Sequence, residues 1–479
     1  LKLTALFRRT RRPMAESRMS TDVYTRVVSS LLFPMHERLK GHDTTAVRRL
    51  METTQWYAGE RLEQWCNDRM RRFLVQAGER VPYYRQLFAE TGFNPHNYES
   101  AADLGSLPFL TKALIRSNTD ELLADNAGEV SRFNTGGSTG EPLIFFMGKE
   151  RVSHDVAAKW RATRWWGVDI GDPEIVVWGS PVELGAQDRI RCVRDKLLRT
   201  ELLPAFEMSP GKLDNFIESI LKRKPKMLFG YPSALSHIAS HARQSKVRLD
   251  NQGIQVAFVT AERLYDEQRA LISDVFGCRV ANGYGGRDAG FIAHECQAGN
   301  MHITAEDIFV EVVDAQGGVL PAGESGELVV THMATSDFPF IRYHTGDVGV
   351  LDDRPCSCGR GLPILKEIQG RSTDFVVAMD GTVMHGLALI YVVRDIPGIK
   401  TFKIIQETLS RSRILLVTGD GFEPKLDEVI RKGFRNRLGS RVTIDIEHVN
   451  EIPAEASGKF RYVISHVDAG IRSGTKQHG

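Results

Sequence analysis

Short β-type runs that alternate with helical patterns between residues 174 and 290 constrain the fold of this chain more than any other feature. Apolar runs at Ile175–Trp178, Met227–Phe229 and Val256–Val259 have the length expected of buried strands. Amphipathic helical patterns follow two of these runs, at Ser233–Arg243 and Tyr265–Val275. Strands that alternate with helices at this spacing predict an α/β core.

Different patterns flank this core. Helical periodicity dominates the chain before it, for example at Arg61–Ala77, and a hairpin-rich β segment follows it at Phe309–Val313 and Gly326–Thr331. Beyond Gly370-Arg371 the pattern restarts as a small α+β arrangement. We predict a large N-terminal region at 19–371 (a helical segment at 19–130 and an α/β core at 131–371), a small mobile α+β domain at 372–467 and a loose tail at 468–479.

Charge and cysteine content exclude several classes of protein. The 479 residues include 62 Lys and Arg against 60 Asp and Glu, so the net charge of +2 does not favour nucleic-acid binding. Six cysteines in a chain of this length indicate a reducing compartment, and we expect a cytoplasmic protein. We allow for a homo-oligomer.

Two segments could be mistaken for targeting or membrane signals. Residues 1–18 are rich in arginine but lack an apolar stretch, so we expect a disordered extension and ordered protein from about Met19. The apolar stretch Phe375–Val393 is interrupted by Asp380, Gly381 and His385. It is a poor bilayer segment, and we expect no membrane span.

A loop rich in glycine and hydroxyl groups is the clearest local motif. It contains Thr135, Gly136, Gly137, Ser138, Thr139 and Gly140, followed by Glu141-Pro142. Such a loop can present backbone N–H groups and short donors to a phosphate chain. It lacks the ending of a P-loop and the glycine spacing of a dinucleotide fingerprint, and a surface turn is the alternative interpretation.

Four further motifs occur in order after this loop. They are Asn282-Gly283-Tyr284-Gly285-Gly286-Arg287-Asp288, Tyr343-His344-Thr345-Gly346-Asp347, Gly370-Arg371 and Ala456-Ser457-Gly458-Lys459. In this order and spacing the set resembles that of the adenylate-forming superfamily of acyl-CoA synthetases. Val81-Pro82-Tyr83-Tyr84-Arg85 and Gly230-Tyr231-Pro232-Ser233 look like its phenylacetate–CoA ligase-like branch, and the whole chain resembles the capsule and exopolysaccharide biosynthesis members.

The resemblance implies a large adenylate-forming region, a small mobile C-terminal domain, and a role for each motif. The Thr135–Gly140 loop would hold the ATP phosphates, Tyr284 would lie near the adenine, and Asp347 would accept the ribose hydroxyls. Arg371 would contact the nucleotide near the hinge, and Lys459 would stabilise charge at the α-phosphate. The pocket for the acid would include Tyr231, Ala261, Glu262 and Gly283.

Two positions depart from the usual motifs. Asp288 stands where the superfamily usually carries a Glu that helps bind Mg²⁺, and Thr373 stands at the usual hinge Asp. With Asp288 and Lys459 as catalytic residues, the implied reaction activates a carboxylic acid with ATP to an acyl-adenylate, whose acyl group then passes to CoA. The implied partners are therefore a small carboxylic acid, ATP and CoA, in a ligase that would serve polysaccharide biosynthesis.

A second constellation is independent of ATP. Cys356-Ser357-Cys358-Gly359-Arg360 holds two thiols in a glycine turn, and Cys296 and His302 lie upstream. Three thiolates and an imidazole make a complete tetrahedral set for a structural Zn²⁺. Some members of the resembled branch carry a zinc at such a turn. His294 could replace His302, and the cysteines could instead be free thiols.

Three other functions remain open from the sequence. Adenylation could serve an amine or a carrier-protein thiol instead of CoA. The nucleotidyl group could be transferred to a cofactor such as a deazaflavin. The departures at Asp288 and Thr373 also keep open a non-catalytic, zinc-stabilised assembly factor.

Overall fold

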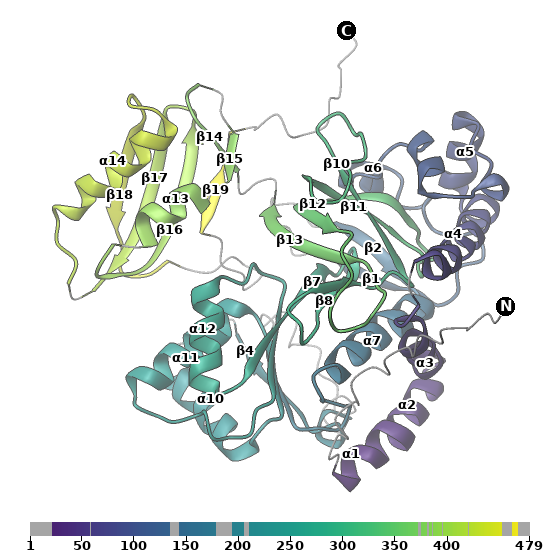
Figure 1. Cartoon of the computed structure of the whole chain (residues 1–479), viewed down its shortest axis with the longest axis horizontal. Coiled ribbons are helices and arrows are strands. Elements are labelled where there is room, and N and C mark those ends of the chain that lie inside the picture. Colours follow the sequence, from purple (N-terminus) through teal and green to yellow (C-terminus); the bar gives the residue numbers. More distant parts are fainter. Residues whose placement is uncertain are drawn as a thin grey trace, which may run out of the picture.

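The computed structural model describes most of the chain (Figure 1). The described residues are 22–57, 59–134, 143–178, 194–205, 210–371, 375–380, 383–385, 387–394, 396–419, 421–452 and 462–467. The extension at 1–18, the Thr135–Gly140 loop, Thr373, Lys459 and the tail at 468–479 lie outside them. Within the described part of the chain, no helix has the length and apolar character needed to cross a membrane.

Helices make up the first hundred described residues. Pro82 occupies the first turn of a helix, where its missing N–H costs no hydrogen bond. The longest helix buries Leu62, Met70, Phe73 and Leu74 along one stripe, as its periodicity predicts. The elements are α1 (Val23–Val27), the π-helical turn η1 (Val28–Leu32), α2 (Phe33–Leu39), α3 (Thr44–Thr54), α4 (Glu60–Arg80), α5 (Pro82–Thr91), the 3₁₀ turns η2 (Pro95–Asn97) and η3 (Ala101–Ser106), and α6 (Lys112–Ser117).

A mixed sheet forms the centre of the molecule. Its described strands follow the order β10-β11-β12-β13-β9-β8-β7-β6-β5-β3-β4, in which β7, β6, β5, β3 and β4 are parallel and the others antiparallel. The strands are β3 (Glu174–Trp178), β4 (Thr200–Pro204), β5 (Met227–Gly230), β6 (Val256–Thr260), β7 (Arg279–Gly286), β8 (Gly290–Glu295), β9 (Met301–Ile303), β10 (Ile308–Val313), β11 (Ser325–His332), β12 (Phe340–Asp352) and β13 (Ile364–Arg371).

Helices cover both faces of the parallel strands, which explains their continuous apolar sequence. Leu228 and Val259 pack against α10 (Pro210–Arg223), α11 (Pro232–Gln244) and α12 (Asp266–Phe276). Phe229 and Phe258 point to the other core, which includes Trp165 and Trp166 at the end of α7 (Lys149–Arg164). The hairpin β1 (Ser131–Asn134) and β2 (Ile144–Met147) brackets the glycine-rich loop, because Asn134 pairs with Ile144.

A second, smaller sheet follows the large one and lies apart from it in Figure 1. Its order is β18-β17-β16-β19, and it has its own core around Leu389, Phe402 and Phe434. The predicted fold class, a large α/β region with a small α+β C-terminal part, is confirmed. The elements are β14 (Phe375–Val377), β15 (Val383–His385), α13 (Leu387–Arg394), β16 (Ile399–Thr408), β17 (Arg411–Thr418), α14 (Leu426–Leu438), β18 (Thr443–His448) and β19 (Val463–Ser465).

Candidate functional site

The carboxyl ends of β3, β5, β6 and β7 meet at one edge of the large sheet. Tyr231 directly follows β5, Ala261 and Glu262 follow β6, and Gly283 lies beside Thr260 in the register of β6 and β7. In open α/β sheets this edge is where ligands bind. The four residues predicted for the acid pocket are therefore brought to a single edge.

Side chains and backbone pack closely at this edge of the sheet. The Trp178 and Tyr231 rings stack with centroids 4.2 Å apart, which adds Trp178 to the pocket candidates. A Cβ at Gly230 would lie 2.6 Å from the carbonyl oxygen of Val177, so only glycine fits between β5 and β3. Ala261 has a φ of +71°, a left-handed conformation that is rare for alanine and is often found at functional sites.

The Glu262 side chain is turned toward a helix start. Its Oε2 accepts a hydrogen bond from the Ser233 backbone N–H at 3.2 Å, at the beginning of α11. A carboxylate is stabilised there by the unpaired N–H groups and the dipole of the helix. This contact ties the turn after β6 to the helix after β5.

Two of the nucleotide motifs meet through one hydrogen bond. The Tyr284 hydroxyl donates to Oδ2 of Asp347 at 2.8 Å, although the two residues are 63 positions apart. Burial, together with the Asp347 carboxylate, raises the pKa of Tyr284 well above its ordinary value, so the phenol stays a donor. Asp347 also faces Arg371 in the register of β12 and β13. Asp347 and Arg371 therefore lie on neighbouring strands, and the Tyr284 side chain reaches Asp347 from β7, although β13, β9 and β8 lie between β12 and β7 in the strand order.

The turn that carries Asp288 is held by hydrogen bonds on several sides. Asp288 Oδ2 accepts from the Tyr343 hydroxyl at 2.7 Å, and its Oδ1 accepts from the Ala289 N–H at 3.1 Å. Arg151, on α7, places Nη2 at 3.4 Å from the carbonyl oxygens of Arg287 and Asp288. Because a carboxylate has about four acceptor positions, Asp288 keeps capacity for a cation.

Sequence reasoning missed Arg151 as part of this site. Its side chain is only 2% exposed, and its Nε donates to Asp155 at 2.8 Å, which in turn lies 3.8 Å from His332. Burial raises and the Arg151 charge lowers the pKa of Asp155, and the net effect is a lowered pKa. Nothing in the sequence distinguishes Arg151 from the other arginines of α7, because only the tertiary fold buries it.

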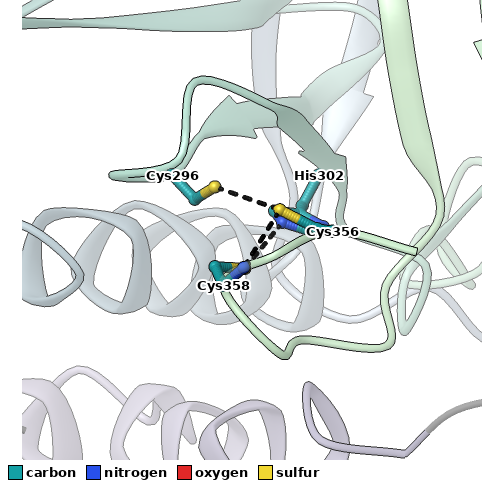
Figure 2. Close-up of side chains that lie close together, drawn as sticks. All are labelled: Cys296, His302, Cys356 and Cys358. Atoms are coloured by element: carbon teal, nitrogen blue, oxygen red, sulfur yellow. Dashed lines mark hydrogen bonds between the residues drawn. The ribbon is translucent and has the colours of Figure 1, made fainter. Parts of the chain in front are cut away.

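The four predicted metal ligands form one cluster. The ligand atoms of Cys296, His302, Cys356 and Cys358 all lie within 4.8 Å of one another, and Figure 2 shows their side chains turned toward a common centre. The Sγ atoms of Cys296 and Cys356 are 3.6 Å apart. Two thiolates at any two corners of a tetrahedron around Zn²⁺ would be about 3.8 Å apart, given Zn–S distances of about 2.3 Å. The spacing therefore suits that ion.

The surroundings of the cluster select one nitrogen of His302 as the ligand. Nδ1 lies 3.0 Å from the Leu362 carbonyl oxygen, which can only accept, so Nδ1 carries the proton. Nε2 is then the lone-pair nitrogen, and it faces Cys358 Sγ at 3.2 Å. A carbonyl oxygen behind the second ring nitrogen is typical of metal-binding histidines.

Hydrogen bonds also favour the thiolate form of one cysteine of the cluster. The contact with Cys296 and the backbone and side-chain donors of Arg360 lower the pKa of Cys358, against the opposing effect of burial. A thiolate is the form that binds metals.

His294 does not take the place of His302. Its ring is 1% exposed, lies between Phe291 and Phe258, and is absent from the four-residue cluster. Burial lowers the pKa of His294 to about 3, so the ring is neutral. We interpret it as a core residue.

Known proteins resemble this chain over most of its length. Residues 376–466 match the family described as the CapK C-terminal domain. Protein CapK of Staphylococcus aureus is 23% identical over 90% of this chain and 94% of its own length. A phenylacetate–coenzyme A ligase of Thermus thermophilus is 24% identical over 85% of this chain and 96% of its own length.

A solved structure shows the same fold. The 2-hydroxyisobutyryl-CoA ligase, captured in the postadenylation state with an acyl-AMP, aligns with a TM-score of 0.69 at 21% identity, over 85% of this chain and 90% of its own. The resemblance found in the motifs is thus confirmed at the level of homology and of fold. The chain is a homologue of CapK and of the phenylacetate–coenzyme A ligases, and it has the fold of the adenylate-forming superfamily.

Proposed function

We propose that the chain is an AMP-forming acid–thiol ligase. ATP and a carboxylic acid give an acyl-adenylate and pyrophosphate, and the thiolate of CoA then displaces AMP to form a thioester. The observation that carries this proposal is the Tyr284–Asp347 hydrogen bond, because Tyr284 follows Gly283 at the sheet edge that also carries Tyr231 and Glu262. The ligase relatives, and a neighbour that binds an acyl-AMP, support it.

Asp347 is proposed to orient the ribose. Its carboxylate can accept from two adjacent hydroxyls, and the Tyr284 hydroxyl, kept protonated by burial, holds one of its oxygens in place. Asp288 is proposed to help hold Mg²⁺, which neutralises phosphate charge when it is bound. The hydrogen bonds from Tyr343 and Ala289 fix the direction of that shorter carboxylate.

Lys459 is proposed to stabilise the charge that develops between the acid and the α-phosphate. The segment that carries it ends at Tyr462, whose ring centroid lies 5.6 Å from that of Tyr265. Tyr265 follows the pocket turn at Glu262 by three residues. This ring contact joins the start of β19 to the start of α12, close in sequence to Glu262, and it supports an approach of the C-terminal part to the proposed pocket.

Pyrophosphate exchange tests the first half-reaction. With pooled aromatic, fatty and amino acids, we expect acid-dependent ATP–pyrophosphate exchange by the wild type. In Lys459→Ala the rate should fall by about 10²–10³-fold, the effect of removing one preorganised charge-stabilising donor. Lys432→Ala, at an exposed lysine of α14 in the same part of the chain, is the matched control and should exchange normally. Undiminished exchange by Lys459→Ala would remove that residue from the reaction.

Product analysis tests the acceptor. With CoA present, we expect an acyl-CoA thioester and free AMP in equal amounts. An amide product would instead assign an amine acceptor, and AMP retained on the product would assign nucleotidyl transfer. The resemblance of the whole chain to the capsule and exopolysaccharide biosynthesis members supports an acid destined for polysaccharide assembly. The low cysteine content, six in 479 residues, supports a cytoplasmic site for the reaction.

We also propose that Cys296, His302, Cys356 and Cys358 hold a structural Zn²⁺. Three of these residues are buried, and four protein ligands fill a tetrahedral shell. Through a bound ion these residues would join the turn before β9 to the turn between β12 and β13, both of which border strands of the large sheet. No ligand position would remain for substrate, so a bound ion would contribute to stability.

Arg151 is proposed as a positioning residue for the Asp288 turn. Arg151→Met should destabilise the fold by about 1–3 kcal/mol, because it leaves the partly buried Asp155 carboxylate (17% exposed) without its cation. It should also raise the Mg²⁺ concentration needed for half-maximal exchange. Arg161→Met is the matched control, because it breaks another buried pair, Arg161–Glu306, away from that turn. If both variants lost the same stability and showed the same shift in Mg²⁺ dependence, Arg151 would have only a structural role.

A further inference from the structure

An exposed apolar stripe runs along α1, η1 and α2. Its members are spaced four residues apart and are between 43% and 87% exposed: Val23, Val27, Leu31, Met35 and Leu39. In a regular α-helix a spacing of four rotates by about 40° per step, so such a stripe would wind around the helix. The wider π-helical turn at Val28–Leu32 reduces this drift and keeps the stripe on one side.

The opposite side of the same helices is docked on the protein. Phe33 packs edge-on against Trp160 with ring centroids 5.1 Å apart, and the Thr25 hydroxyl donates to Asp172 at 2.9 Å. Val28 is fully buried. The orientation of the helices is therefore fixed by their inner face, and the outward direction of the stripe follows from it.

A basic cavity adjoins the stripe. It measures about 240 Å³, and four arginines and three hydroxyl residues contribute to its wall: Arg26, Arg48, Arg49, Arg164, Ser29, Ser30 and Thr45. Asp169 is the one acidic residue among the described residues that line it. Glu52 pairs with both Arg48 and Arg164, and Asp169 also pairs with Arg164, so four arginines stand against two carboxylates at this cavity.

Hydrogen-bonding capacity remains at the wall of this cavity. Within the described part of the chain, the buried Thr45 hydroxyl and Arg48 Nε have no hydrogen-bond partner. Buried donors without partners are rare in native structures and point to an unseen partner. The guanidinium N–H donors of arginine and the hydroxyl groups in a cavity of this size suit a phosphate group.

We propose that this face docks the protein on an anionic lipid bilayer, with the apolar stripe in the boundary of the acyl chains and a phospholipid phosphate in the basic cavity. Helices with an apolar stripe and flanking basic residues bind membrane interfaces in this way. Figure 1 shows α1 and α2 on the opposite side of the molecule from the four-stranded sheet, so docking leaves the proposed active site accessible.

Charge argues against the other occupants of the stripe. Arg26, Arg38 and Lys40 are exposed beside it, so a second copy of the chain would bring like charges together. The segment before residue 22 carries five arginines between positions 8 and 18, and it would likewise meet a basic cavity. An anionic surface is the complementary partner.

Vesicle co-sedimentation of the full chain tests the proposal. We expect binding to vesicles of phosphatidylcholine mixed with phosphatidylglycerol and much weaker binding to pure phosphatidylcholine. Leu31→Ser with Met35→Ser should weaken partitioning at least about tenfold, from the apolar area lost. Arg26→Gln with Arg49→Gln should weaken it about thirtyfold, because the variant removes two positive charges near the anionic surface. Val429→Ser, at an exposed apolar position of α14 (51% exposed), is the matched control and should bind normally.

Other results would overturn the proposal. The proposal would be wrong if the wild type did not bind the anionic vesicles, or if the variant with Leu31→Ser and Met35→Ser bound them as well as the wild type. A wild-type dimer that the stripe variant converts to a monomer would assign the stripe to a second copy. Binding of inorganic phosphate without vesicle binding would assign the cavity to a free phosphate. Unchanged circular dichroism and unchanged pyrophosphate exchange in solution would show that each variant is folded.

Discussion

Asp347→Ala is expected to lower the ATP–pyrophosphate exchange rate by about 10²–10³-fold, the largest loss we expect from a residue that the structure describes. Two charge-assisted hydrogen bonds to the ribose would be lost, each worth about 1.5–3 kcal/mol. Nucleotide binding, measured by calorimetry, should weaken in parallel, because these bonds are made in the ground state as well.

Two further variants make this prediction sharper. Tyr284→Phe keeps the Asp347 carboxylate but removes the donor at 2.8 Å, so the loss should be smaller, about tenfold. Asp353→Ala, at an exposed carboxylate just beyond β12, is the matched control and should behave as the wild type. If Asp347→Ala binds ATP and exchanges pyrophosphate normally, the nucleotide site lies elsewhere.

Loss of the metal is the second large effect that we expect. Purified protein should contain one zinc ion per chain by elemental analysis, and Cys356→Ser should lose it. The stability lost with the ion is about 4 kcal/mol when free zinc exceeds its dissociation constant a thousandfold. Strong chelators should lower the thermal midpoint of the wild type and leave that of Cys356→Ser unchanged.

The direction of the pH dependence follows from the ligands. Thiolates and the neutral imidazole of His302 bind the ion, so protonation at falling pH should release it and reduce stability. Cys278→Ala is the matched control, because Cys278 is a buried cysteine outside the cluster. Purified wild-type chain without zinc, and with a thermal midpoint that chelators do not change, would contradict the proposal and favour free thiols.

Local sequence patterns were sufficient for the secondary structure of the core. Strands were predicted at Met227–Phe229 and Val256–Val259, and the structure has them at Met227–Gly230 and Val256–Thr260. The prediction succeeds because strands buried on both faces must be continuously apolar, whatever they pack against. The motif spacing likewise indicated the superfamily, since each motif needs its residue types within a few positions.

Contacts between distant segments were decided by the tertiary structure alone. Only the fold brings Tyr284 to Asp347, places His302 instead of His294 with the three cysteines, and buries Arg151 beneath the Asp288 turn. The apolar stripe from Val23 to Leu39 has the periodicity of a core helix, and only the packing of its opposite face shows that it points outward. The sequence by itself determined which elements form, because their periodicity is local. Which faces are buried and which side chains meet depends on how those elements pack, and that is a property of the whole chain.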